Sequence, residues 1–125
     1  MSNFTTPLKG EISDDGEHII LTEKFEYHIG MYPSEEVIDI PIGFESDFAS
    51  IPSYAQCLLP KLGKYSKAAV LHDYLYVIAY KNKKFADLTF LEAMMVLNVP
   101  SWKRYLMYHA VRTFGKGNYI GDDDN

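Results

Sequence analysis

Residues 68–80, with the sequence AAVLHDYLYVIAY, constrain the fold more than any other part of this chain. The stretch has the apolar content of a helix, yet no Lys, Arg or Glu occurs between Lys67 and Lys81. A surface helix normally presents a charged or polar face to the solvent. We therefore predict a helix that is buried around most of its circumference and that carries His72 and Asp73 into an interior.

The N-terminal third has the pattern of strands and turns. Residues 17–30 and 35–43 are rich in β-branched and aromatic side chains, and Asp15-Gly16 is a typical hairpin turn. From residue 66 the apolar period becomes helical, which predicts helices over 66–80, 84–98 and 100–114. The fold class is therefore α+β, with a small N-terminal antiparallel β-sheet packed on a C-terminal three-helix unit.

One domain accommodates this organisation. We expect a single domain over 1–125, with strands mainly in 1–43, an ordered loop over 44–65, three helices in 66–114 and a tail over 115–125. No apolar run reaches the roughly 18 residues of a membrane span, so no membrane span is expected. The net charge of −5 and the lack of a large basic cluster argue against nucleic acid as a partner. Cys57 is alone, which excludes a disulfide framework within the chain.

A buried carboxylate is the clearest polar feature of the helical part. On a helical wheel, Asp87 falls at the centre of an apolar stripe with Phe90, Leu91 and Met94, while Thr89 lies opposite. A carboxylate in a core costs several kcal/mol unless it is paired or hydrogen-bonded. The preceding helix is its nearest neighbour in the chain. Its apolar arc is predicted to contain Leu71, Tyr74, Leu75, Val77 and Ile78, and its remaining sector His72, Asp73 and Tyr76. We predict that Asp87 lies within hydrogen-bond reach of His72 or Tyr76.

Two further polar residues, Asp47 and His109, lie in apolar surroundings in the sequence. Asp47 lies in an unusually apolar loop sequence, where it is either a turn-capping carboxylate or a metal ligand. His109 shares a helical face with Trp102, Tyr105, Leu106 and Thr113, and we interpret it as structural.

The polar cluster has two interpretations. It is either a buried hydrogen-bond network that fixes helix packing or a catalytic site. As a site, His72 would be a general base oriented by Asp87, while Asp47 and Asp73 would hold a divalent cation such as calcium.

Two resemblances bear on the catalytic interpretation. The arrangement His72-Asp73-x-x-Tyr76, with an Asp on the next helix, resembles the catalytic helix pair of secreted A-type phospholipases. That resemblance implies a base at His72, a calcium ligand at Asp73, and Tyr76 and Asp87 as braces; the flanking Cys pairs and the glycine-rich calcium loop are absent. The sequence Leu71-His72-Asp73 also resembles the metal-binding pair of His-Asp phosphohydrolases, which are all-helical and require a further helical His.

A broader resemblance covers residues 37–115. The sequences GFESDFASIP, AAVLHDYLY and FADLTFLEAM are similar to a phage and prophage family, domain of unknown function 1353. The resemblance implies a phage origin and marks seven motif positions: Asp47, Ser50, Pro52, His72, Asp73, Tyr76 and Asp87.

Two functions follow as expectations. The first is a bacteriophage virion-associated (tail or particle) or accessory protein. It would occur in the host cytoplasm during infection or in the virion, with other phage structural proteins or further copies of itself as partners. The alternative is a small cation-dependent hydrolase acting on ester, amide or cell-envelope substrates.

Overall fold

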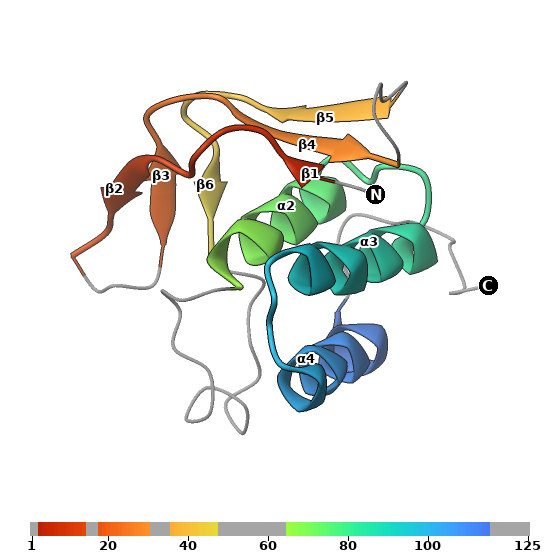
Figure 1. The fold of residues 1–125 in the computed structure, drawn as a ribbon. Coiled ribbons are helices and arrows are strands. Elements are labelled where there is room, and N and C mark those ends of the chain that lie inside the picture. Colours follow the sequence, from red (N-terminus) through yellow and green to blue (C-terminus); the bar gives the residue numbers. More distant parts are fainter. Residues whose placement is uncertain (1–2, 15–17, 31–35, 48–64, 116–125) are drawn as a thin grey trace. The chain divides into compact units, whose positions relative to one another are not determined.

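The computed structural model describes residues 3–14, 18–30, 36–47 and 65–115. The chain divides into two compact units, residues 1–47 and 48–125, and each is described by itself. Among the described residues, the first unit contains strands and the second contains three helices, which confirms the α+β class (Figure 1). The single-domain organisation stays a prediction.

The first unit contains two three-stranded antiparallel sheets where the sequence predicted one small sheet. One has the order β1-β4-β5, from Asn3–Phe4, Phe25–Ile29 and Glu36–Ile40. The other has the order β2-β3-β6, from Gly10–Ile12, Ile19–Leu21 and Glu45–Ser46. Strand β6 falls at the start of the predicted 44–65 loop, because its Glu45 and Ser46 pair with β3; residues 48–64 of that loop lie outside the described part.

Alternating side chains build the buried side of each sheet. In β4 and β5, Phe25, Tyr27, Ile38 and Ile40 are buried while Asp39 is exposed. Phe4 of β1 stacks on Phe25 with ring centroids 5.3 Å apart. Strands β2 and β3 pair from Gly10↔Leu21 to Ile12↔Ile19, as expected for the hairpin predicted around Asp15-Gly16, although those two residues lie outside the described part. The alternating pattern of residues 17–30 and 35–43 therefore predicted β3, β4 and β5 correctly.

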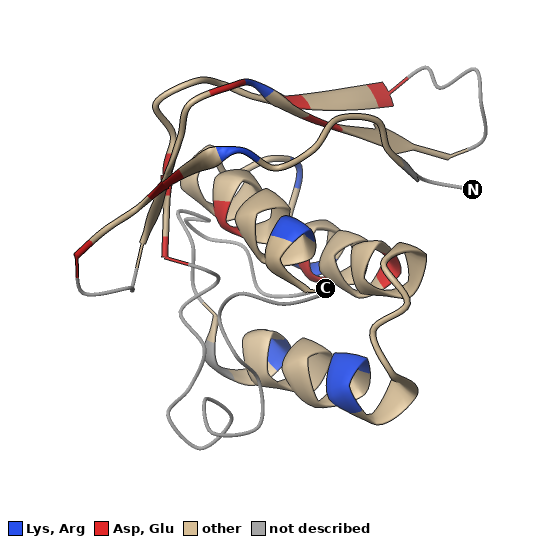
Figure 2. Ribbon diagram, turned by 60° about the vertical axis from the view of Figure 1, so that its left-hand side comes forward, with Lys and Arg blue, Asp and Glu red and all other residues tan. Residues whose placement is uncertain are grey.

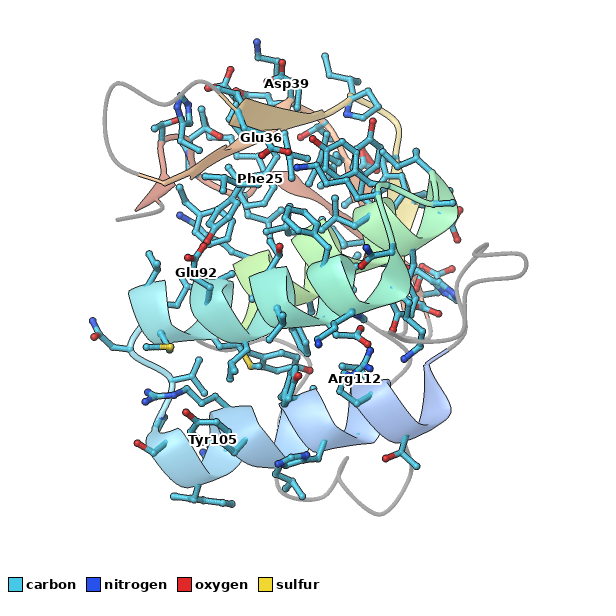
Figure 3. All side chains as sticks on the ribbon, turned by 90° about the vertical axis from the view of Figure 1, so that its right-hand side faces the viewer. Phe25, Glu36, Asp39, Glu92, Tyr105 and Arg112 are labelled. Atoms are coloured by element: carbon cyan, nitrogen blue, oxygen red, sulfur yellow. The ribbon has the colours of Figure 1, made fainter. Side chains whose placement is uncertain are left out.

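The described residues of the second unit form α2 (Ser66–Val77), α3 (Lys83–Val96) and α4 (Ser101–Phe114). Helix α3 lies between α2 and α4 and contacts both (Figures 1 and 3). Asn82 is the N-cap residue of α3, because its side chain accepts a hydrogen bond from Phe85 N at 2.7 Å. Helix α4 begins directly after Pro100, which cannot donate a backbone hydrogen bond. No helix among the described residues is both long and apolar enough to cross a membrane.

Helices α2 and α3 end earlier than the sequence predicted. After α2, Ala79 N donates to Tyr76 O and Tyr80 N donates to Leu75 O, and Ala79 has a φ of 51°. After α3, Asn98 makes the corresponding bond to Met95 O with a φ of 61°. This is the Schellman pattern, in which a left-handed residue closes the last turn. It is difficult to foresee at Ala79, because alanine seldom adopts that conformation.

The buried faces also differ in part from the predicted ones. In α2, Leu71 and Leu75 are buried as predicted, whereas Tyr74 is half-buried and Val77 and Ile78 are 49% and 45% exposed. The buried side of this helix instead includes small residues such as Ala68 and Ala69 and extends around to His72 and Tyr76.

The buried arc of α3 is wider than predicted. Thr89, expected on the side opposite Asp87, is buried, while Leu91 is half-buried. The reason is that α3 contacts α2 on one side and α4 on the other, so that two faces of this helix are covered.

Candidate functional site: a buried carboxylate shared by three helices

Asp87 on α3 is the centre of the helical unit's polar cluster. Its side chain is 0% exposed, which confirms the predicted burial. His72 Nε2 on α2 lies 2.7 Å from Asp87 Oδ1, and Tyr76 Oη, one turn further along α2, donates to the same oxygen at 2.5 Å. The predicted contacts between Asp87 and the polar sector of α2 are therefore both present.

The second carboxylate oxygen is bound by two cations that the sequence analysis did not assign. Lys83 Nζ donates to Asp87 Oδ2 at 2.9 Å, and Arg112 Nη1 donates to it at 3.0 Å. Figure 3 shows Arg112 in the space between α4 and α3. Each oxygen thus receives two hydrogen bonds, and the four donors come from all three helices.

Lys83 also binds the C-terminal end of α4. Its ammonium donates to Val111 O at 3.0 Å and to Arg112 O at 3.1 Å, in addition to Asp87. Three acceptors use the full donor capacity of an ammonium group. The negative end of the α4 dipole also favours a cation at this position. Lys83, at 6% exposed, therefore joins the beginning of α3 to the end of α4.

The electrostatics of the cluster favour an ionised carboxylate. Burial raises the pKa of Asp87, but the hydrogen bonds and charge of His72, together with the hydrogen bonds from Tyr76 and Lys83, outweigh burial and bring the pKa from 3.8 to about 2. Since a carboxylate only accepts hydrogen bonds, His72 donates from Nε2. In a neutral imidazole, Nδ1 is then the nitrogen able to accept a proton.

Aromatic rings enclose the imidazole of His72. Its ring centroid lies 4.1 Å from that of Tyr76 and 4.6 Å from that of Phe90, with the Phe90 ring nearly parallel at 29°. The residue is 1% exposed. These contacts hold the ring in one orientation and remove it from bulk solvent.

Gly115 lies against Tyr76 where α4 ends. A Cβ at position 115 would lie 2.5 Å from Tyr76 Oη and 2.6 Å from Val111 O, which is closer than such atoms approach one another. The φ of Gly115 is −68°, so close packing and not an unusual backbone conformation accounts for glycine at this position. Gly115 thereby allows Tyr76 to reach Asp87.

The two predicted metal ligands belong to different units. Asp47 is half-buried directly after β6, and Asp73 is half-buried on α2 beside His72. Among residues 3–14, 18–30, 36–47 and 65–115, no group of three or more His, Cys, Asp or Glu side chains is arranged to hold a metal ion. The calcium site remains a prediction. The motif positions Ser50 and Pro52, and also Cys57, lie outside the described residues.

His109 and its neighbours lie on the solvent side of α4. Trp102 is 56% exposed and Tyr105 is 45% exposed, and His109 and Thr113 are exposed as well. The sequence analysis correctly placed them on one face, but its interpretation of His109 as a structural residue is not supported by this exposure. The buried side of α4 is formed by Met107, Ala110 and Val111.

Lys83 had a weak sequence signal, and Arg112 had none. Lys83 lies four residues before Asp87, a spacing that brings two helical side chains together. The signal was missed because Lys83 was assigned to the connection between two helices. Arg112 could not have been found from helical spacing, because 25 residues separate it from Asp87.

Comparison with known proteins bears on the family resemblance found in the sequence. A protein from Sinorhizobium fredii (strain NBRC 101917 / NGR234), described as "Uncharacterized protein y4jT", is 36% identical over 78 residues. The match covers 61% of this chain and 23% of that protein, so the chain spans about a quarter of the relative's length. No solved structure shows a significant match. The family described as "Protein of unknown function (DUF1353)" matches residues 19–111, which include all the residues around Asp87 except Arg112 and Gly115, and the chain belongs to this family.

Proposed function

We propose that this chain is a bacteriophage-encoded virion-associated or accessory protein in which the Asp87 cluster is a structural clamp and not a catalytic centre. The observation that supports the structural clamp is that both oxygens of the Asp87 carboxylate are fully hydrogen-bonded. Its two oxygens accept four hydrogen bonds from α2, α3 and α4, two of them from Lys83 and Arg112. Such an arrangement holds three helices in one packing.

The position of His72 also supports a structural role. A general base must come within hydrogen-bond distance of the proton that it removes. The imidazole is enclosed by Tyr76 and Phe90 and is 1% exposed, so a substrate would have to displace an aromatic neighbour. The phage assignment is supported by the motif resemblance in sequence. Partners would be other structural proteins of the particle or further copies of this chain.

A hydrolase is the second candidate, and one specific observation favours it. His72 Nε2 binds a carboxylate that also accepts from Tyr76, which is the arrangement implied by the resemblance to A-type phospholipases. In that function Nδ1 of His72 would take a proton from water, and Asp73 with Asp47 would hold the cation.

One pair of variants separates these functions. In His72→Gln the side chain still forms hydrogen bonds but no longer titrates near neutral pH. For a structural clamp, we expect a free energy of unfolding lower by about 1–3 kcal/mol. No hydrolysis of esters, phospholipids or peptidoglycan fragments by the wild type is expected. His109→Gln, an exposed position on α4, is the matched control and should leave stability unchanged.

The opposite result would establish the hydrolase. A wild-type rate that falls by about 10²–10⁴ in His72→Gln, with melting unchanged, would show that the imidazole is a catalytic base. The virion assignment has a separate test, which is mass spectrometry of purified particles of a phage that encodes this chain. Recovery of the protein in stoichiometric amounts supports a particle component, and its absence from particles restricts the role to an accessory one.

A further inference from the structure

The charges of this chain are divided unequally between its two units. Residues 1–47 contain eleven acidic and two basic side chains, a net charge of −9, whereas residues 48–125 contain six acidic and ten basic ones, a net charge of +4. The two values together give the −5 of the whole chain. Figure 2 shows acidic positions (red) along the strands and their connections, and only basic ones (blue) on α4.

At the start of α4, exposed aromatic residues lie beside half-buried basic ones. Trp102 and Tyr105 are the exposed aromatic residues, and α4 contains Lys103, Arg104 and Arg112 with no acidic residue. The Lys103 ammonium lies 5.5 Å from the Trp102 ring centroid, and the Arg104 guanidinium carbon lies 5.6 Å from that of Tyr105. Trp, Tyr and Arg are the residues that most often dominate binding energy in protein interfaces. We call Trp102, Tyr105, Lys103 and Arg104 the α4 face.

The sheet β2-β3-β6 presents a surface of the opposite character. Glu11 is paired with Ile20 and Ile20 with Glu45, so the three side chains form one row across the strands. Ile20 is 42% exposed and both glutamates are exposed. Their neighbours Ile19 and Ser46 alternate to the buried side. We call Glu11, Ile20 and Glu45 the acidic row.

We infer that the α4 face of one copy of this chain binds the acidic row of a second copy. Each surface has an exposed apolar centre beside charges of one sign, and the signs are opposite. A contact between two α4 faces is disfavoured, because both would be basic. The contact is therefore heterologous, and repetition of it builds a ring or an open chain of copies. The inference is based on charge and exposure alone and holds equally for a hydrolase.

Self-association of the intact protein is the first test. In sedimentation equilibrium, the average mass should increase above that of the monomer as concentration rises to about 100 µM at low salt. The association should weaken as ionic strength rises from about 0.05 M to 0.5 M, because salt screens exposed charges. Trp102→Ala should raise the Kd by about tenfold or more, as is typical of an interface hot spot. Leu88→Ala, at an apolar position of α3 that is 43% exposed, should leave the Kd unchanged.

Complementary variants identify the two surfaces. Glu11→Lys/Glu45→Lys reverses the charge of the acidic row, and Lys103→Glu/Arg104→Gln reverses the charge of the α4 face. Arg104 donates a hydrogen bond to Val99 O, and Gln is chosen at this position because its amide keeps a donor. Each double variant alone should be monomeric. An equimolar mixture should associate again, because the intact α4 face of one variant meets the intact acidic row of the other and the two reversed surfaces are also opposite in charge.

Three results would overturn the inference. The first is a wild type that is monomeric at about 100 µM and low salt. The second is a mixture of the two double variants that stays monomeric. The third is a double variant whose melting temperature changes while its average mass remains that of the wild type. That result would show that the charged groups pair within one chain.

Discussion

At the scale of single residues, Asp87 connects groups that are distant in sequence. It accepts hydrogen bonds from positions 4, 11, 15 and 25 residues away. A buried ion pair does not by itself imply high stability, because desolvation of the charges opposes their attraction. Removing one member is nevertheless costly, since the remaining charges stay buried without a counter-charge.

Asp87→Asn is expected to destabilise the helical unit by about 3–5 kcal/mol, the usual effect of breaking a buried charge pair. The amide replaces one acceptor by an NH₂ group, which would face either Lys83 and Arg112 or His72 and Tyr76, all of them donors. Urea unfolding followed by circular dichroism measures the change. Asp39→Asn is the control, because the Asp39 side chain is 57% exposed; equal losses in both variants would contradict the clamp.

The pH dependence of stability follows from the low pKa of Asp87. Because the pKa of about 2 in the folded chain lies below the ordinary value of 3.8, the ionised carboxylate contributes stability above about pH 4. That contribution is lost as the pH falls from about 4 toward 2. Glu26, whose pKa is also about 2 beside Lys24, Thr5 and His28, adds a dependence of the same sign. Between pH 2 and 5, the melting temperature should therefore change less with pH in Asp87→Asn than in the wild type. An equal pH dependence in the two proteins would contradict the low pKa of Asp87.

Gly115→Ala should displace Tyr76 from Asp87, because the added methyl would lie 2.5 Å from Tyr76 Oη. We expect a loss of about 1–3 kcal/mol, as for overpacking of a well-filled core. Tyr76→Phe removes the oxygen that the methyl meets first. The double variant should therefore lose less than the sum of the two single changes. Strict additivity in this cycle would show that Gly115 acts independently of Tyr76.

At the scale of elements, helix ends are determined by backbone bonds that side-chain patterns reveal poorly. The Schellman pattern after α2 puts alanine at a φ of 51°, where an L side chain is strained. Ala79→Gly should raise the free energy of unfolding by about 0.5–1 kcal/mol, since relief of strain exceeds the added entropy of the unfolded chain. Asn98→Gly should have a smaller effect, because asparagine tolerates the left-handed region. Thermal melting of both variants measures the difference, and destabilisation by Ala79→Gly would refute the strain.

The elements differ in how well the sequence predicted them. The three helices and the longer strands β3, β4 and β5 follow from apolar periodicity, and the link from Asp87 to α2 follows from the rule that buried charges need partners. Strand β2 belongs to the hairpin predicted around Asp15-Gly16, whereas the short strands β1 and β6 depend on pairing with distant residues, which no local pattern specifies. Arg112 was missed for the same reason. Trp102 and Tyr105 were grouped correctly, but a helical wheel does not show which face meets the neighbouring helix.

At the scale of the whole molecule, the predicted cation can be tested through stability. The two predicted ligands are Asp47 in the first unit and Asp73 in the second, and a calcium ion bound by them would raise the melting temperature by mass action. With the clamp as the function of the cluster, we expect calcium at about 1 mM and subsequent EDTA to leave the melting temperature unchanged. Differential scanning fluorimetry measures this directly. A saturable increase that disappears in Asp73→Asn would instead establish the metal site.

The shared carboxylate also affects how long the folded helical unit persists. Contacts between groups 15 and 25 residues apart close loops at an entropic cost, so we expect them to form late in folding. Interactions absent from the transition state do not speed folding; they slow unfolding. Asp87 therefore extends the lifetime of the folded state, a property of value to any protein that must outlast the cell in which it was made.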